Sequence, residues 1–247
     1  MAVKRVVLFD LGNTLLYFDA ARPKVYARAD QELVTELKRA GLKLDRKEFT
    51  QKFRVRLEAY YAQRESEFIE HTTTHVLTTL LAENGYAQIS DDILLPALEK
   101  MYAVSQEHWL LEGDAVTCLE ALKKRGYELV IVSNAGDDAD VQLLVDKNDL
   151  RQYFEFVLTS AACGIRKPNP RIFDIALERL AIPPQDAVMA GDKLGADILG
   201  ARNAGIYSIW VTRRADIPAN RDHADTIKPD ASIHNLQELP ALLSSLH

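Results

Sequence analysis

The chain has 247 residues, of which 47% are hydrophobic and 27% are charged, and its formal net charge at pH 7 is −6. This composition is typical of a globular protein with one large domain or a core and a smaller companion, and the acidic charge without a basic stripe argues against a nucleic-acid partner. Two cysteines give no disulfide framework and no apolar stretch approaches membrane-spanning length, so we expect a cytoplasmic protein with no membrane partner.

The first predicted element is a buried strand over Val3–Phe9, a continuous apolar run rich in β-branched residues. The pattern then becomes helical from about residue 23 to residue 109, with no strand expected. Gly41 and Gly85 stand where helices should end, and Asp45 and Ser90 where helices should begin. The helices predicted on this basis cover approximately 23–40, 46–64, 68–84 and 91–109.

After residue 110 the pattern changes to an alternation of helices and strands. Strands are expected over 127–133, 154–160, 187–192 and 206–212, and helices near 114–125, 138–147, 170–180 and 194–204. Such alternation indicates a parallel sheet flanked by helices. The predicted fold class is therefore α/β, with a Rossmann-like parallel-sheet core (1–17 and 110–247) and an inserted all-helical cap domain (18–109).

Polar side chains follow several of the predicted strands at the point where each strand ends. Asp10 ends the first, Ser133 and Asn134 end the second, and Asp192 ends the fourth with Asp197 shortly after. Lys167 precedes Pro168 in the part of the chain between Asn134 and Asp192. Each residue alone would be read as an ordinary cap, turn or loop residue. Because strand ends of a parallel sheet meet at one edge, together they predict a ligand site there.

This combination of residue types suits a divalent cation bound beside a phosphoryl group. Mg²⁺ prefers oxygen ligands, usually one or two carboxylates together with phosphate and water. A lysine and a serine hydroxyl can then hold the remaining phosphoryl oxygens while a carboxylate attacks phosphorus.

In these motifs the sequence resembles the haloacid dehalogenase-like (HAD) hydrolase superfamily. FDLGNTLL matches the first motif, D-x-D-G-T, at Asp10 and Thr14, and VIVSN matches the second at Ser133. RKP matches the third at Lys167, and GDKLGAD matches the fourth at Asp192 and Asp197. The resemblance covers essentially the whole core, and the helical insert is similar to the family's α-helical cap.

The resemblance implies a role for each matched residue. Asp10 would be the catalytic nucleophile that forms an aspartyl-phosphate, with Lys167 offsetting its charge. Ser133, Asn134 and Lys167 would bind the phosphoryl group. The implied cofactor is Mg²⁺, and its ligands would be Asp10, the Gly12 carbonyl, Asp192 and Asp197. The implied partner is a small phosphorylated metabolite, and a homodimer is left open.

Position 12 departs from the family pattern, because the second Asp of the first motif is replaced by Gly12. In the family, that Asp protonates the leaving group and later activates water. Acid–base catalysis of this kind raises the rate by about 10²–10⁴-fold. A leaving group of low pKa would need little protonation, or a cap residue or a water molecule could substitute. The third explanation is a catalytically impaired phosphate-binding or regulatory protein.

The expected function is Mg²⁺-dependent hydrolysis of a small phosphomonoester through an aspartyl-phosphate. A phosphonate hydrolase and a dehalogenase rank below it, the latter because dehalogenases of the superfamily carry an aromatic residue at the position of Gly12.

The cap and the loop after the second core strand offer further candidates. His71 and His75 lie four residues apart on a predicted helix and could face a site together, although a surface or packing role is the simpler interpretation. Tyr60, Tyr61 and Arg64 could contact a substrate or belong to the cap core. Three acidic residues are interpreted as helix N-terminal acids and not as metal ligands, namely Asp137, Asp138 and Asp140.

Overall fold

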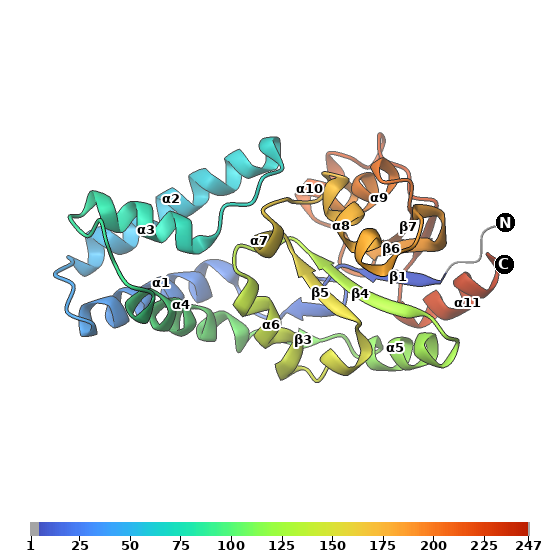
Figure 1. Cartoon of the computed structure of the whole chain (residues 1–247), viewed down its shortest axis with the longest axis horizontal. Coiled ribbons are helices and arrows are strands. Elements are labelled where there is room, and N and C mark those ends of the chain that lie inside the picture. Colours follow the sequence, from blue (N-terminus) through green and yellow to red (C-terminus); the bar gives the residue numbers. More distant parts are fainter. Residues whose placement is uncertain (1–4, 247) are drawn as a thin grey trace.

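The structure is a computed structural model that describes residues 5–246, and it has a sheet-containing half and a helical half (Figure 1). Within these residues a parallel sheet has the strand order β5-β4-β1-β6-β7-β8. The strands are β1 (Val6–Phe9), β4 (Glu128–Ser133), β5 (Phe156–Thr159), β6 (Ala187–Gly191), β7 (Tyr207–Val211) and β8 (Ala231–Ile233). The predicted α/β class is confirmed. The first two residues of the predicted strand over 3–9 lie outside the described residues, and β8 was not anticipated.

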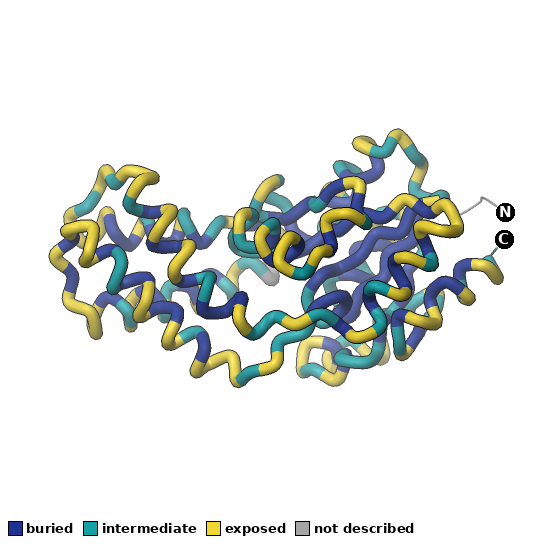
Figure 2. Tube along the Cα trace, turned by 90° about the horizontal axis from the view of Figure 1, so that it is seen from below, coloured by how far each residue is buried: buried dark blue, intermediate teal, exposed yellow. Residues whose placement is uncertain are grey.

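Helices cover both faces of this sheet. Val7 and Phe9 of β1 pack with α5 (Ala115–Lys124), α6 (Asp138–Lys147) and α11 (Leu239–Ser244). Val6 and Leu8 point to the other face, where α8 (Arg171–Leu180) and α9 (Leu199–Asn203) lie. Because both faces are covered, the central strands β1 and β6 are buried along their length, as the dark segments of the sheet in Figure 2 show. The short helices α7 (Ser160–Cys163) and α10 (Pro218–Arg221) lie in the connections.

The helical half, called the cap here, is formed by α1 (Arg22–Arg39), α2 (Arg46–Glu67), α3 (Thr73–Glu83) and α4 (Asp91–Gln106). Its apolar side chains make a separate hydrophobic cluster that includes the fully buried Leu33, Phe53 and Leu77. The all-helical insert is therefore as predicted. Three helix limits were wrong, because α2 continues to Glu67, residues 68–72 are not helical and α4 ends before Trp109. Residues 69–70 instead pair with the core, a long-range contact that helical periodicity does not reveal.

A short antiparallel ribbon connects the two halves. It pairs β2 (Leu16–Phe18) with β3 (Trp109–Leu111), and Phe18 stands opposite Trp109. The prediction of no strand up to residue 109 was thus wrong at its last residue, since pairing of segments ninety residues apart leaves no local pattern. The predicted domain limits at 17/18 and 109/110 fall inside this ribbon, and they stay a prediction.

The predicted helix over 194–204 has an irregular first part. Residues Leu194–Ile198 form a π-helical turn before α9 begins. The Asp197 carboxylate accepts a hydrogen bond from the Lys193 backbone N–H at 2.9 Å. A Cβ on Gly191 would lie 2.4 Å from that carboxyl group, so the glycine of the G-D motif makes room for Asp197. Turns of this type often occur at functional sites.

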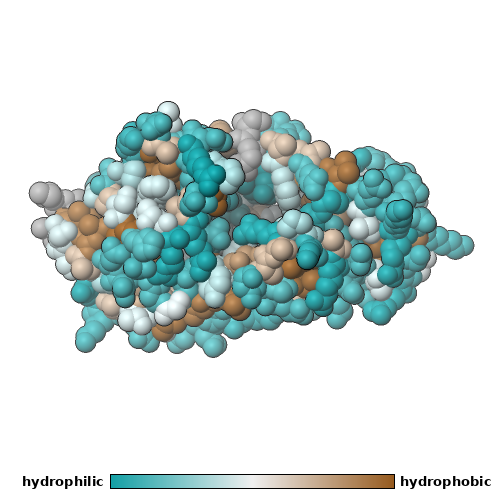
Figure 3. Space-filling view, turned by 180° about the vertical axis from the view of Figure 1, so that it is seen from behind, coloured by the Kyte–Doolittle hydropathy of each residue, from teal (hydrophilic) through white to brown (hydrophobic). Residues whose placement is uncertain are grey.

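The outer surface shows no sign of a bilayer-spanning segment. Among residues 5–246, none of the helices is long and apolar enough to cross a membrane. The face seen in Figure 3 is mostly hydrophilic, with hydrophobic atoms in small separate patches.

Candidate active site

The carboxyl ends of β1, β4 and β6 bring the predicted site residues together on the side of the sheet that faces the cap. Asp10 follows β1, Ser133 ends β4, and Asp192 follows β6. Lys167 reaches the same place from the loop after α7, and Asp197 reaches it from the π-helical turn after β6. These five residues, all buried, are called the floor. Four of them line one cavity of about 290 Å³, and Asp192 lies directly behind them with no exposed surface.

Lys167 lies at the centre of the floor. Its Nζ donates to Asp10 Oδ1 at 2.7 Å and to the Val132 carbonyl at 2.7 Å, and it lies 2.7 Å from Asp197 Oδ1. Burial opposes the charge on the ammonium, but Asp10 and Asp197 outweigh this effect and raise the pKa of Lys167 above its ordinary value. Lys167 therefore stays protonated and holds the Asp10 carboxylate in one orientation.

The three floor carboxylates have the chemistry of a hard-cation site. Asp10, Asp192 and Asp197 each offer an oxygen, and these oxygens lie within 4.8 Å of one another. Asp192 Oδ1 is buried and has no hydrogen-bond partner among the described residues. Burial, with Asp10 and Asp197 nearby, raises the pKa of Asp192 well above its ordinary value. An orphaned carboxylate oxygen beside two others fits a divalent cation, and the all-oxygen donor set fits Mg²⁺.

Asn134 lines the same cavity, and its side chain bonds to the backbone of the loop that carries Lys167. Its Oδ1 accepts from the Lys167 backbone N–H at 2.9 Å, and its Nδ2 donates to the Lys167 carbonyl at 2.9 Å. The side chain therefore braces the backbone of Lys167 on both sides. No local sequence pattern indicates this pairing across 33 residues.

Gly12 is explained by a residue of the ribbon and not by its own backbone. Only its neighbour Asn13 has a left-handed φ, 59°, which asparagine tolerates. A Cβ on Gly12 would lie 3.1 Å from Cη2 of Trp109, a contact closer than side chains ordinarily make. The Trp109 indole thus occupies the space into which the side chain of a residue at position 12 would project.

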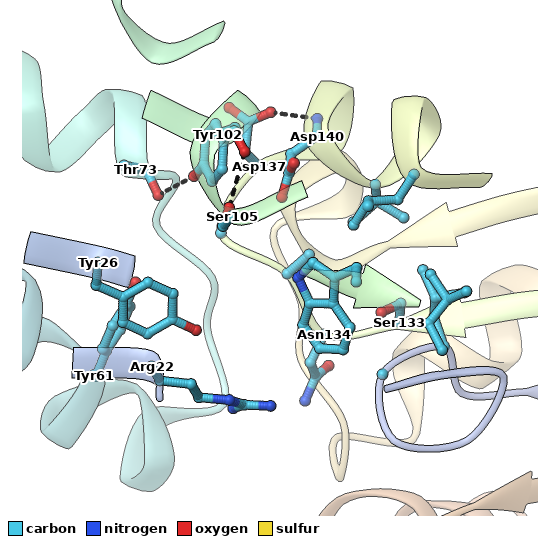
Figure 4. A pocket seen from close by; sticks show the side chains of 18 of the residues that line it. Arg22, Tyr26, Tyr61, Thr73, Tyr102, Ser105, Ser133, Asn134, Asp137 and Asp140 are labelled. Carbon is cyan, nitrogen blue, oxygen red and sulfur yellow. Dashed lines mark hydrogen bonds between the residues drawn. The ribbon is translucent and has the colours of Figure 1, made fainter. Parts of the chain in front are cut away.

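The roof of the cavity belongs to the cap (Figure 4). Arg22, Tyr26, Tyr61 and Arg64 come from α1 and α2, and Tyr102 comes from α4. Two of the candidates named from the sequence, Tyr61 and Arg64, line this cavity. The third, Tyr60, is buried beside it and donates a hydrogen bond to Glu70 at 2.6 Å.

The histidine pair is not part of the cavity lining. His71 precedes α3, so the prediction that both histidines lie on one helix was wrong. Their rings are stacked with centroids 5.1 Å apart, and both residues are exposed. The simpler surface interpretation fits these positions.

Glu70 is a functional candidate that sequence reasoning missed, because a helix was expected at its position. Its carboxylate is fully buried at the junction of cap and core. It accepts hydrogen bonds from Arg166, from Ser160 Oγ at 2.6 Å and from Arg64 at 3.3 Å. Backbone bonds from Glu70 N to the Gly164 carbonyl and from Arg166 N to the Phe68 carbonyl run alongside. The network ties the α2–α3 connection to the loop that carries Lys167.

The acidic residues after β4 have two roles. Asp137 accepts from the Asp140 backbone N–H at 2.9 Å and caps α6, which agrees with the predicted helix N-terminal acids. Asp137 and Asp140 also line the cavity opposite Arg22 (Figure 4). Burial raises the pKa of Asp140 to about 7, although its carboxylate accepts from Gln106 of α4 at 2.8 Å.

Comparisons with known proteins agree with this geometry, which is that of a capped α/β protein with an oxygen-rich site at the sheet edge. Residues 4–205 match the model of the haloacid dehalogenase-like hydrolase family. The chain therefore belongs to this family and is one of its hydrolases.

Individual relatives show how far the likeness extends. Haloacid dehalogenase-like hydrolase domain-containing protein 3 of Bos taurus is 32% identical over 84% of this chain and 81% of its own length. A glyceraldehyde 3-phosphate phosphatase of Methanothermobacter thermautotrophicus is 37% identical, but the match spans only 49% of this chain and 54% of that protein. The crystal structure of a 2-haloacid dehalogenase from Pseudomonas syringae pv. Tomato DC3000 is 28% identical, covers 99% of this chain and 100% of its own, and gives a TM-score of 0.67.

Proposed function

We propose that the protein hydrolyses a small phosphomonoester with Mg²⁺ as cofactor and Asp10 as the nucleophile. The observation that carries the proposal is the floor itself. One ammonium, that of Lys167, lies 2.7 Å from an oxygen of both Asp10 and Asp197, while a third carboxylate, Asp192, keeps an oxygen without a partner. This arrangement supports binding of a cation and a phosphoryl group side by side.

The chain's own residues would act in a simple order. Lys167 orients Asp10 and lowers the cost of bringing a dianionic phosphoryl group beside its carboxylate. The Ser133 hydroxyl lines the cavity and donates to a phosphoryl oxygen. An Asp10 oxygen then attacks phosphorus, the ester oxygen leaves, and water hydrolyses the aspartyl-phosphate to regenerate Asp10 and release phosphate.

The residues that would hold Mg²⁺ are Asp10, the Gly12 carbonyl, Asp192 and Asp197. The ion would supply charge neutralisation for the phosphoryl oxygens.

The environment of Gly12 supports an unfilled acid–base role. A Cβ at position 12 would already lie 3.1 Å from the indole of Trp109, which leaves little room for a carboxyl group, and the indole has no proton to exchange at neutral pH. The leaving group then departs without a proton from this position, so the rate should fall steeply as the leaving-group pKa rises. Esters of acidic hydroxyl groups, such as anomeric, enol or aryl phosphates, are the best substrates under this proposal.

The test is hydrolysis of aryl and alkyl phosphates with graded leaving-group pKa, by wild type and Asp10→Asn, with Mg²⁺ and with EDTA. We expect turnover that needs Mg²⁺ and falls by at least about 10⁴ in Asp10→Asn, the scale found when catalytic nucleophiles are removed. A folded wild type that hydrolyses none of the esters would instead favour the impaired phosphate-binding or regulatory alternative.

One observation favours a dehalogenase as second candidate. Trp109 places an aromatic ring against position 12, where dehalogenases of the superfamily carry an aromatic residue, and the Pseudomonas syringae structure covers the whole chain. Attack of a carboxylate on a carbon–halogen bond leaves no use for the orphaned Asp192 oxygen, and the phosphatase is therefore preferred. Halide release from 2-chloropropionate that persists in EDTA would reverse this order.

A further inference from the structure

We propose that the preferred substrate carries a second anionic group, a carboxylate or a second phosphate, and that Arg22 of the cap binds it. This inference rests on the proposed function, because it concerns the part of the substrate that does not react. It assigns a specificity-determining role to one residue of the roof.

Arg22 differs in its ion pairing from the other two arginines that line the cavity, Arg54 and Arg64. Arg54 is held by Asp30 through two hydrogen bonds of 2.8 and 2.6 Å, and Arg64 donates to Glu70. No carboxylate lies within ion-pair distance of Arg22 in the part of the chain that the structure describes. Figure 4 shows its guanidinium directed into the cavity toward Asn134. Arg22 is thus the roof guanidinium available to a ligand.

The position of the guanidinium is set by aromatic rings. Its Cζ lies 5.2 Å from the ring centroid of Phe18 and 5.6 Å from that of Trp109. Rings at this distance attract a guanidinium and restrict its motion while leaving its N–H groups free to donate. A planar guanidinium held in this way matches a carboxylate or phosphate through paired hydrogen bonds.

The surrounding backbone favours negative charge at the same place. Arg22 is the first residue of α1, and the first turn of this helix has neither an acidic residue nor a side-chain cap. The partial positive charge of a helix N-terminus therefore adds to that of the guanidinium. Asp137 and Asp140 line the cavity as well, but from α6 on the other side, so the cavity has a basic and an acidic end.

Trp109 determines the distance between the two anionic groups. One edge of its indole contacts position 12 beside Asp10, and Arg22 lies over the same ring system. The phosphoryl group on the floor and the second anion at Arg22 are therefore separated by about the width of an indole. A cavity of about 290 Å³ limits the substrate to a few carbon atoms between them.

The experiment measures kcat/KM for phosphooxyalkanoic acids of three to five carbons and for their primary amides. These alkyl esters should turn over slowly under the proposed function, so the readout is the ratio of acid to amide at one chain length. At these lengths the carboxylate and the amide are far enough from the ester oxygen to leave its pKa nearly the same. Alkanediol bisphosphates, compared with the monophosphates, distinguish a phosphate from a carboxylate as the second anion. The variants are Arg22→Gln, Arg22→Lys and, as matched control, Arg28→Gln, an exposed arginine of the same helix that pairs with Glu107.

For one chain length we expect wild type to prefer the acid over the amide by about 10-fold or more, as for a charge-assisted hydrogen bond at a partly exposed site. Arg22→Gln should bring this ratio close to one with little change for the amide, Arg22→Lys should restore part of it, and Arg28→Gln should leave it unchanged. A ratio near one in wild type at every length, or a ratio that survives Arg22→Gln, would overturn the inference.

Calorimetric binding of the same compounds to Asp10→Asn separates this inference from the proposed function. Selective binding of the anion that depends on Arg22, without turnover by wild type, would contradict the phosphatase proposal alone. Turnover of the esters with equal binding of acid and amide would contradict the role of Arg22 alone.

Discussion

The floor and the roof of the cavity are built on different principles. The floor packs three carboxylates and one ammonium in a buried cluster, and its residues stand at or beside the ends of the buried strands β1, β4 and β6 or in the segments that follow α7 and β6. The roof consists of long side chains from the cap helices, and its arginines are paired, stacked on rings or open to the cavity. The difference teaches that changes in the floor should affect the chemical step for every substrate, whereas changes in the roof should affect which substrate is used.

After the loss of the nucleophile itself, the largest effect is expected for Lys167→Met in the floor. The substitution removes the ammonium that holds Asp10 and leaves the carboxylates of Asp10 and Asp197 without their cation. We expect kcat to fall by about 10³ for all esters, the size found when one charge-stabilising donor is lost. Steady-state kinetics on two unrelated esters checks it, with Lys123→Met, an exposed lysine paired with Glu155, as control. A loss confined to one ester would place Lys167 with the specificity residues instead.

The junction between floor and roof should give the largest loss of stability. In Glu70→Gln the buried Arg166 loses its ion pair with the Glu70 carboxylate, and the loss of a buried ion pair costs about 3 kcal/mol. Urea denaturation measures the free energy of unfolding. Glu83→Gln removes a partly exposed pair with Arg56 and should cost less than about 1 kcal/mol. Equal costs for both variants would show that the junction is no more rigid than the cap surface.

The sequence predicts the floor of the site well and the roof poorly. Asp10, Ser133 and Asp192 stand at strand ends, and a local apolar pattern followed by a polar residue is enough to place them on one edge. Lys167 and Asp197 lie in the segments that follow α7 and β6, and only the family motifs indicated them. Arg22 and Trp109 carry no such signal, because their positions depend on how the cap packs over the core.

Residues 68–72 show the physical limit of local patterns most clearly. Their sequence was compatible with a helix, but the backbone of Glu70 and that of Phe68 bond to the core loop around Gly164 and Arg166. Likewise, the reason for Gly12 is a side chain 97 positions away, as the contact with Trp109 shows. Contacts of this kind follow from tertiary packing and leave no mark in the periodicity.

Position 12 lies where the floor meets Trp109 of the ribbon, so a substitution there tests whether Trp109 limits the chemical step. Gly12→Asp alone should lower kcat/KM, since its Cβ would lie 3.1 Å from Trp109. The double variant Gly12→Asp with Trp109→Ala makes room for the carboxyl group and should raise turnover of alkyl phosphates by about 10–100-fold over Trp109→Ala alone, the lower part of the range for acid–base catalysis. The dependence of rate on leaving-group pKa should flatten at the same time. An unchanged slope would show that another group already protonates the leaving oxygen.

The smallest effect is expected on the acidic side of the cavity, where Asp140 of the core meets Gln106 of the cap. Burial raises the pKa of Asp140 to about 7, so the folded protein binds its proton more tightly than the unfolded chain. The contribution of the Asp140 carboxyl group to the free energy of unfolding is therefore fully present below about pH 4 and is lost as the pH rises through about 7. Asp140→Asn keeps an oxygen that accepts from Gln106 and has no charge, so it should be more stable than wild type at pH 8 and nearly equal to it at pH 4. The expected gain is about 1 kcal/mol, less than the full shift would give, because the side chain keeps some contact with solvent.

The control for this last test lies on the same helix. Asp146 is exposed and pairs with Arg151, whose hydrogen bond lowers the pKa of the carboxyl group. Asp146→Asn should therefore lose stability at high pH, the opposite sign to Asp140→Asn. Urea denaturation at pH 4 and pH 8 compares the two variants with wild type. If Asp140→Asn shows the same difference from wild type at both pH values, its carboxyl group does not titrate in this range. The acidic end of the cavity would then be charged at neutral pH and would repel the phosphoryl group and second anion more strongly than the present geometry implies.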